Sequence, residues 1–101
     1  MNQTTLEKIN DQLYALSGEL SMQNVPQISR ETASLINAMT GEISIDLSKI
    51  TRADSAGLAL LIDWLRIARR RKFTLHFEQL PEQLMQIAQV CELESVLPIN
   101  H

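Results

Sequence analysis

Segments with the two-residue periodicity of strands alternate in this sequence with segments that have the periodicity of helices. Residues 43–47 and 73–77 place apolar side chains at every second position, as a strand with one buried face does. Between them, residues 57–71 carry apolar side chains at helical spacing. A strand, a helix and a strand in this order predict a parallel β-α-β unit with a right-handed crossover.

The N-terminal residues predict a hairpin and a first helix. Residues 6–9 and 13–17 are strand candidates separated by the turn signal Asn10-Asp11, and residues 18–20 end the second strand. Pro26 suits the first turn of a helix, and Asn24 is a possible cap. Gly41 follows the helix, where a left-handed backbone is often needed. The positions at helical spacing are Ile28, Thr32, Leu35, Ile36 and Met39.

Residues 48–54 are predicted as a loop, and Pro81 opens a last helix, after which residues 96–98 close the domain. The apolar positions of this helix are Leu84, Ile87, Ala88 and Cys91. The whole order is β-β-α-β-α-β-α, which predicts an α/β fold and one domain over residues 1–101. We expect a mostly parallel sheet of about four strands covered by helices, with the first strand antiparallel at an edge.

Composition excludes several classes of protein. The net charge of -3 argues against general nucleic-acid binding, which needs a basic face. Cys91 is the one cysteine, so the chain is not a secreted disulfide scaffold. The first residues lack the basic and apolar regions of a signal peptide, and the longest apolar stretch, residues 56–62, is too short to span a bilayer. We therefore expect a soluble, cytoplasmic protein.

Asp54 and Ser55 stand between a predicted strand and the strong helix. Functional groups of open α/β sheets gather beyond the carboxyl ends of the strands. One interpretation is helix capping by a side-chain oxygen, worth about 1 kcal/mol. The other is a serine that contacts a partner or is phosphorylated, with the phosphate held by free N–H groups and the helix dipole. The two interpretations are compatible.

Gly57 lies in the first turn of the same helix, where glycine costs about 1 kcal/mol relative to alanine. The missing side chain either lets a partner backbone approach Ser55 or lets the helix pack closely on its own sheet.

The helix over residues 57–71 has apolar side chains on two sides. At ~100° per residue, Leu61, Ile62 and Leu65 lie within about 60° of Leu58 and form the expected core face. The nearly opposite side carries Leu60, Trp64 and Ile67. This second face predicts a protein interface rich in hot-spot residues, or else a tryptophan that folds onto a neighbouring helix.

Basic residues end this helix: Arg66, Arg69, Arg70, Arg71 and Lys72. Cations at a helix C-terminus complement the dipole. An acidic partner surface or anionic lipid headgroups are the alternative explanations. Arg69 falls on the expected core side, so the helix is predicted to end there or the side chain to extend toward solvent.

Chemistry-bearing patterns are absent from the sequence. It has no glycine-rich phosphate loop, and His76 and His101 lack metal-ligand spacing. Cys91 is predicted to be a buried small apolar residue. No catalytic residue, metal or cofactor is expected, and the chain is predicted not to be an enzyme.

Three stretches within residues 13–98 resemble the STAS domain family, named for sulfate transporters and anti-sigma-factor antagonists. They are Leu16-Ser17-Gly18-Glu19-Leu20, Ile45-Asp46-Leu47-Ser48 and Asp54-Ser55-Ala56-Gly57-Leu58. The last is similar to the family signature Asp-Ser/Thr-x-Gly-Leu, which precedes the second helix.

Within the family, residues 52–61 and 96–98 are most similar to the MlaB type, the STAS subunits of phospholipid-transporting Mla ABC complexes. The resemblance implies binding to an MlaF-like ATPase subunit at the inner membrane, through Asp54, Ser55, Ala56 and Gly57. Serine at position 55, where the MlaB type can have threonine, keeps an alternative open. Anti-sigma-factor antagonists are phosphorylated on that serine by a partner kinase.

Overall fold

The computed structural model describes residues 4–91, 99 and 100, and its elements follow the predicted order β-β-α-β-α-β-α. The predicted closing segment, residues 96–98, lies outside the described residues. The elements are β1 (Thr5–Lys8), β2 (Leu13–Leu20), α1 (Val25–Asn37), β3 (Glu42–Ala53), α2 (Ser55–Arg71), β4 (Thr74–Glu78), α3 (Glu82–Val90) and a short additional strand β5 (Ile99–Asn100).

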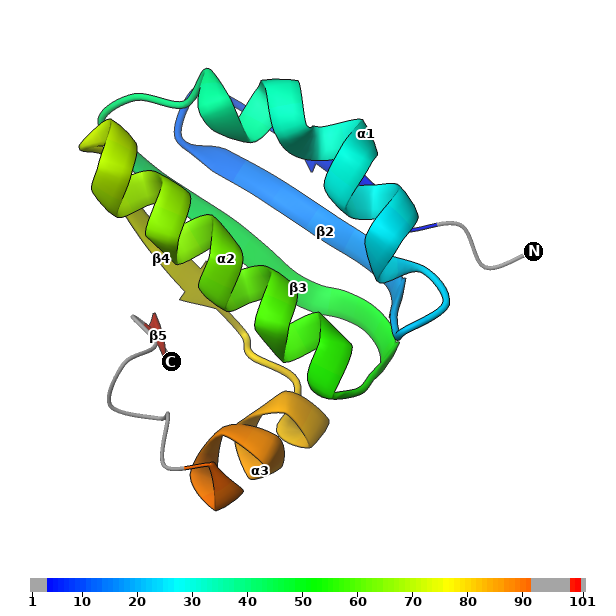
Figure 1. Cartoon of the computed structure of the whole chain (residues 1–101). Helices are drawn as coiled ribbons and strands as arrows, with labels where there is room; N and C mark the ends of the chain where they lie inside the picture. Colours follow the sequence, from blue (N-terminus) through cyan, green and yellow to red (C-terminus); the bar gives the residue numbers. More distant parts are fainter. Residues whose placement is uncertain (1–3, 92–98, 101) are drawn as a thin grey trace.

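The strands form one sheet in the order β1-β2-β3-β4-β5. The antiparallel β1 occupies one edge, as predicted, and the other neighbouring pairs are parallel. Figure 1 shows α1 and α2 side by side on the same face of the sheet, with α3 toward the opposite edge from β1. This arrangement places the ends of β2 and β3, and therefore the starts of α1 and α2, next to each other.

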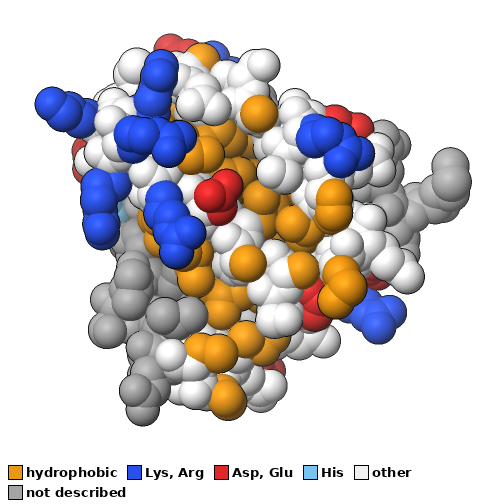
Figure 2. Space-filling view, viewed as in Figure 1, with side chains coloured by type: hydrophobic (Ala, Val, Ile, Leu, Met, Phe, Trp, Pro, Cys, Tyr) orange, Lys and Arg blue, Asp and Glu red, His pale blue; other side chains and the backbone are white. Residues whose placement is uncertain are grey.

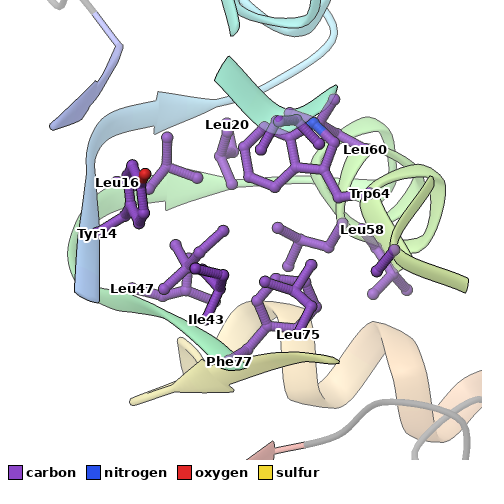
Figure 3. Close-up of a cluster of buried hydrophobic side chains, with 14 of the residues drawn as sticks. Tyr14, Leu16, Leu20, Ile43, Leu47, Leu58, Leu60, Trp64, Leu75 and Phe77 are labelled. Atoms are coloured by element: carbon purple, nitrogen blue, oxygen red, sulfur yellow. The ribbon is translucent and has the colours of Figure 1, made fainter. Parts of the chain in front are cut away.

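The core lies between the sheet and these helices. Alternate residues of the three central strands, among them Leu16, Leu47 and Phe77, are fully buried on the helical side (Figure 3). Burying each such side chain stabilises the fold by roughly 1.5–3 kcal/mol. The alternate positions on the other side, such as Ser44 and Asp46, are polar and half-buried. The alternating pattern therefore corresponds to a sheet that the helices cover on one face only.

The predicted C-terminal ends of β2 and β3 were wrong. Residues 18–20 continue β2 instead of ending it, and residues 48–53, predicted as loop, are the second half of β3. Their backbones pair in parallel, with Leu20 opposite Ala53, although the register shifts beside Gly18, which has a φ of 102°. Side chains in this half of β3 are mostly exposed, so the hydrophobic alternation that marks a strand in sequence is missing.

Helix α1 has Pro26 in its first turn and Asn24 at the N-cap position, as predicted. The Asn24 side chain makes no capping bond; its Oδ1 lies 2.9 Å from Ser21 Oγ. Met39 is buried beyond the end of the helix, and Gly41 has the expected positive φ, 75°.

Helix α3 buries Leu84 and Ala88 as predicted, but the prediction for Cys91 was wrong. The helix ends at Val90, and the Cys91 side chain is exposed. Cys91 lies one residue beyond the last turn of the helix, so the helical spacing of the apolar residues no longer predicts the direction of its side chain.

Candidate functional site

The candidate site lies at the carboxyl ends of β2 and β3. The register pairs Leu20 with Ala53, so the loop that follows β2 lies beside the start of α2. The amide of Ala53 also donates to Gln83 Oε1 at 2.9 Å, which joins the first turn of α3 to the end of β3. Three segments far apart in the sequence therefore meet around Asp54 and Ser55, where family resemblance and sheet topology both predicted a site.

Asp54 holds two of these segments together. Its Oδ1 accepts from the amide of Ala56 at 2.8 Å, which is the predicted N-cap of α2. Its Oδ2 accepts from the amide of Met22 at 3.1 Å, across the gap to the β2–α1 loop. The Asp54 amide donates in turn to the Leu20 carbonyl at 3.1 Å. Asp54 is thus a positioning residue, and it presents the neighbouring Ser55 on a fixed backbone.

Ser55 is the first residue of α2, and its side chain is exposed. A phosphate on Ser55 was expected to meet free N–H groups, but this was wrong for the backbone amides of the next three residues, which are already hydrogen-bonded. The Ala56 amide is bonded to the Asp54 carboxylate, and the Gly57 and Leu58 amides donate to the Asp54 carbonyl at 3.0 and 3.3 Å. Ser55 is accessible to a kinase or a partner, but added phosphate would share the positive end of the helix dipole with a carboxylate.

Gly57 is required by the packing of the chain on itself. It is buried, and a Cβ at this position would lie 2.6 Å from the Leu20 carbonyl oxygen and 2.8 Å from Leu20 Cβ. Of the two interpretations of this glycine, close approach of the helix to its own sheet is the one that the geometry supports. The absent side chain lets the start of α2 touch the end of β2.

We expect Gly57→Ala to lower the free energy of unfolding by about 1–3 kcal/mol, because the added methyl group must displace backbone. Gly41→Asn is the control: nothing lies within 4 Å of a Cβ at Gly41, and asparagine tolerates its positive φ. Urea unfolding followed by circular dichroism measures both. Equal stability of the two variants would contradict the assignment of Gly57 to helix-on-strand packing.

Asp54→Ala should lower the free energy of unfolding by about 2 kcal/mol, because it removes a helix cap and the charged acceptor to which the Met22 amide donates. Hydrogen exchange of the Met22 and Ala56 amides, measured by NMR, should accelerate together. Asp46→Ala is a matched control, since within the described part of the chain the Asp46 side chain accepts from the local Ser48 amide alone, at 2.9 Å. Acceleration at Ala56 alone would show that Asp54 caps the helix without fixing the neighbouring loop.

The predicted second apolar face of α2 is not a surface. Leu60 is 3% exposed and Trp64 is 2% exposed, and both point into the core with Leu20 and Leu58 (Figure 3). Around the helix axis, at ~100° per residue, the buried positions of α2 form one arc that is centred about 90° from Leu58. The two predicted faces were therefore the two edges of a single wide buried face. Helix α2 contacts α1 on one side and α3 on the other, which explains this width. The interface interpretation was therefore wrong, and the burial of Trp64 agrees with the alternative, a tryptophan that folds onto a neighbouring helix.

Ile67 and Met22 are among the apolar side chains that are not fully buried. Ile67 is half-buried against the core. Met22, which the sequence patterns did not single out, is 73% exposed in the loop that Asp54 holds. Met22, whose amide is bonded to Asp54, is the kind of flexible apolar side chain that adaptable binding surfaces use.

Helix α2 continues past Arg69 to Arg71, so of the two alternatives for Arg69 the extension of its side chain toward solvent is the correct one. The Arg69 side chain is exposed, and Lys72 forms the left-handed C-cap with a φ of 64°. Figure 2 shows Lys and Arg side chains gathered over this end of α2, the end away from Ser55.

A cavity of about 350 Å³ lies at the other end of the sheet. Charged and polar residues line it, including Lys8, Asp11, Gln12 and Glu42, so it is unlike the apolar pocket of a lipid carrier. Among the described residues, no cluster of His, Cys, Asp and Glu side chains has the arrangement of a metal site. The same part of the chain contains no helix that is long and apolar enough to cross a membrane.

Comparisons with known proteins agree with this geometry. The family model described as "Mlab, STAS domain" matches residues 7–98. A comparison with curated protein sequences found no match.

Solved structures share the fold at low sequence identity. SpoIIAA from Bacillus in its unphosphorylated form has a TM-score of 0.72 and 19% identity, over 97% of this chain and 88% of that one. Its phosphorylated form has a TM-score of 0.69 and 17% identity, over 97% of this chain and 91% of that one. An anti-sigma-factor antagonist (STAS) domain protein from Planctomyces limnophilus has a TM-score of 0.76 and 15% identity, over 96% of this chain and 88% of that one.

Proposed function

The chain belongs to the STAS domain family, in its MlaB-like branch, and from this premise we propose that it is a non-catalytic accessory subunit of an Mla-type phospholipid-transport ABC complex. In this role it binds the cytoplasmic ATPase subunit and supports the assembly and activity of the complex at the inner membrane. The complex in turn maintains the lipid asymmetry of the outer membrane. The match of the MlaB-type model to residues 7–98 is the observation that carries the proposal.

The geometry of the site supports docking by its exposed residues. Ser55 and Met22 stand out from a backbone that Asp54 fixes, so a partner meets a surface that needs little ordering. Ala56 is half-buried, whereas Gly57, Leu60 and Trp64 act from the interior by holding α2 in place. We therefore propose Met22, Asp54, Ser55 and Ala56 as the centre of the contact with the ATPase, with Ile67 at its margin.

An anti-sigma-factor antagonist is the second candidate. The observation in its favour is an exposed serine at position 55, the first residue of α2. Phosphorylation would add roughly two negative charges beside Asp54, enough to release a partner from this surface.

Tagged chain purified from its native host, followed by mass spectrometry of its partners and of Ser55, separates the two candidates. We expect an ABC ATPase with a Walker motif to co-purify in stoichiometric amount with unmodified Ser55. The purified ATPase complex should then lose activity when the subunit is removed and regain it when the subunit is added back. A serine kinase bound to partly phosphorylated chain would replace the transporter proposal with the sigma-factor switch.

A further inference from the structure

The C-terminal end of α2 is the most strongly charged part of the molecule. Residues 66–72 contain five of the nine basic residues of the chain, and all five side chains are exposed. The remainder carries four basic and twelve acidic residues, so the chain is sharply polarised. Within the described residues, the ion pairs are Lys8 with Asp11 and His76 with Glu42, and neither involves this basic end. We call Arg66, Arg69, Arg70, Arg71 and Lys72 the basic end.

Complementing the helix dipole does not account for five cations. The dipole acts only within the last turn, and one or two charges there give most of its benefit. Arg66 faces Arg69 and Arg70 at the i,i+3 and i,i+4 spacings, where like charges destabilise a helix. The chain therefore keeps a cluster of like charges at some cost to folding. The exposed Asp63, three residues before Arg66, offsets part of the repulsion, and an external anion would offset more of it.

The basic end and the proposed docking residues share one side of α2. At ~100° per residue, the exposed positions Ala59, Arg66 and Arg70 lie within about 60° of Ser55, opposite the buried arc. The helix has 17 residues and is about 25 Å long. A partner interface of ordinary size, about 800 Å² on each side, is wide enough to reach from Ser55 to Arg70.

The surroundings favour a protein partner over a bilayer. The apolar side chains within residues 66–72 are Ile67 and Ala68, and both pack toward the core, so no apolar group stands ready to enter a membrane. The excess of acidic residues elsewhere on the chain would also be repelled by anionic lipid. Four of the five cations are arginines, whose planar guanidinium groups bind carboxylates in a bidentate manner.

We propose that the basic end is a second contact area, which binds an acidic surface of the protein that docks at Ser55. The identity of that protein as the transporter ATPase rests on the proposed function; the preference for a carboxylate-rich protein surface does not. The two areas have different roles in binding. The basic end accelerates association and orients the two proteins, and the surface around Ser55 provides the short-range shape complementarity.

An acidic probe tests the surface without the ATPase. A ten-residue polyglutamate peptide is titrated into ¹⁵N-labelled chain, and NMR shifts are followed at each amide. We expect the shifts to concentrate at residues 66–72 and the dissociation constant to rise about tenfold between 50 and 300 mM salt, because screening weakens exposed charge pairs. Arg66→Gln with Arg70→Gln should weaken binding about fivefold or more.

The control keeps the net charge equal. Arg30→Gln with Lys49→Gln removes two exposed cations from α1 and β3, and peptide affinity should change less than about twofold. Equal weakening by both pairs of substitutions would reduce the effect to net charge and overturn the proposal. The proposal would also be overturned if the chain did not bind the peptide but co-sedimented with phosphatidylglycerol vesicles in a way that depends on Arg66 and Arg70.

The same variants are then measured against the purified ATPase. The association rate should fall about tenfold for the Arg66 and Arg70 substitutions and stay within about twofold for the control. If wild-type chain does not bind the ATPase, the proposed function fails, and the peptide titration still decides the basic end. If the ATPase binds all variants at equal rates, the basic end is not part of that contact and the inference fails alone.

Discussion

Replacing Trp64 with alanine is expected to remove about 3–5 kcal/mol from the free energy of unfolding. The indole is 2% exposed, and it is packed with Leu20, Leu58 and Leu60 in the centre of the core (Figure 3). Alanine leaves a cavity that the surrounding helices and strands fill only in part. Because small domains have roughly 5–15 kcal/mol of stability in total, the variant should lose much of its resistance to urea.

Circular dichroism during urea unfolding is the suitable measurement, since Trp64 is the one tryptophan of the chain and its fluorescence disappears with it. Arg70→Ala on the exposed side of α2 is the control and should change stability by no more than about 0.5 kcal/mol. A Trp64→Ala protein that unfolds at the wild-type urea concentration, yet no longer binds the ATPase, would restore Trp64 as a docking residue.

Replacing Ser55 with tryptophan should have the opposite effect: little loss of stability and a large loss of binding. The side chain is exposed at the first position of α2, so the free energy of unfolding should change by about 0.5 kcal/mol or less. Affinity for the ATPase should fall about 30-fold or more, because the bulky ring separates the two surfaces at the centre of the contact, where about 2 kcal/mol is typical.

Ser34→Trp is the matched control. Ser34 is also an exposed serine on a helix, but it lies near the other end of the sheet, in the last turns of α1. Titration calorimetry with the purified ATPase should give wild-type affinity for Ser34→Trp. Unchanged affinity for Ser55→Trp would place the contact elsewhere on the molecule, and equal losses in the two variants would indicate a nonspecific effect.

Together these substitutions separate two roles that one sequence pattern had combined. Residues 54–67 contain side chains that we propose to face a partner and side chains that hold the helix on the sheet. Ser55 belongs to the first group, whereas Gly57, Leu60 and Trp64 belong to the second. A loss of binding in the second group therefore needs a stability measurement before it is assigned to the interface.

The sequence by itself determined the order of the elements and the position of the candidate site at the start of α2. Alternation at 43–47 and helical spacing at 57–71 were enough for a parallel β-α-β unit, since these periodicities come from backbone geometry within each segment. Asp54 was correctly expected to cap α2, because capping depends on neighbouring residues alone. The family signature at residues 54–58 likewise needs no long-range information.

Only the tertiary structure decided which apolar faces were buried and where β3 ended. The orientation of Trp64 depends on α1 and α3, which flank α2, and no pattern within α2 reports its neighbours. Residues 48–53 are a strand because the backbone of β2 pairs with them, although their side chains lack the apolar alternation. The bond from the Met22 amide to Asp54 spans 32 positions in sequence, and it forms because parallel strands bring their carboxyl ends to the same edge of the sheet.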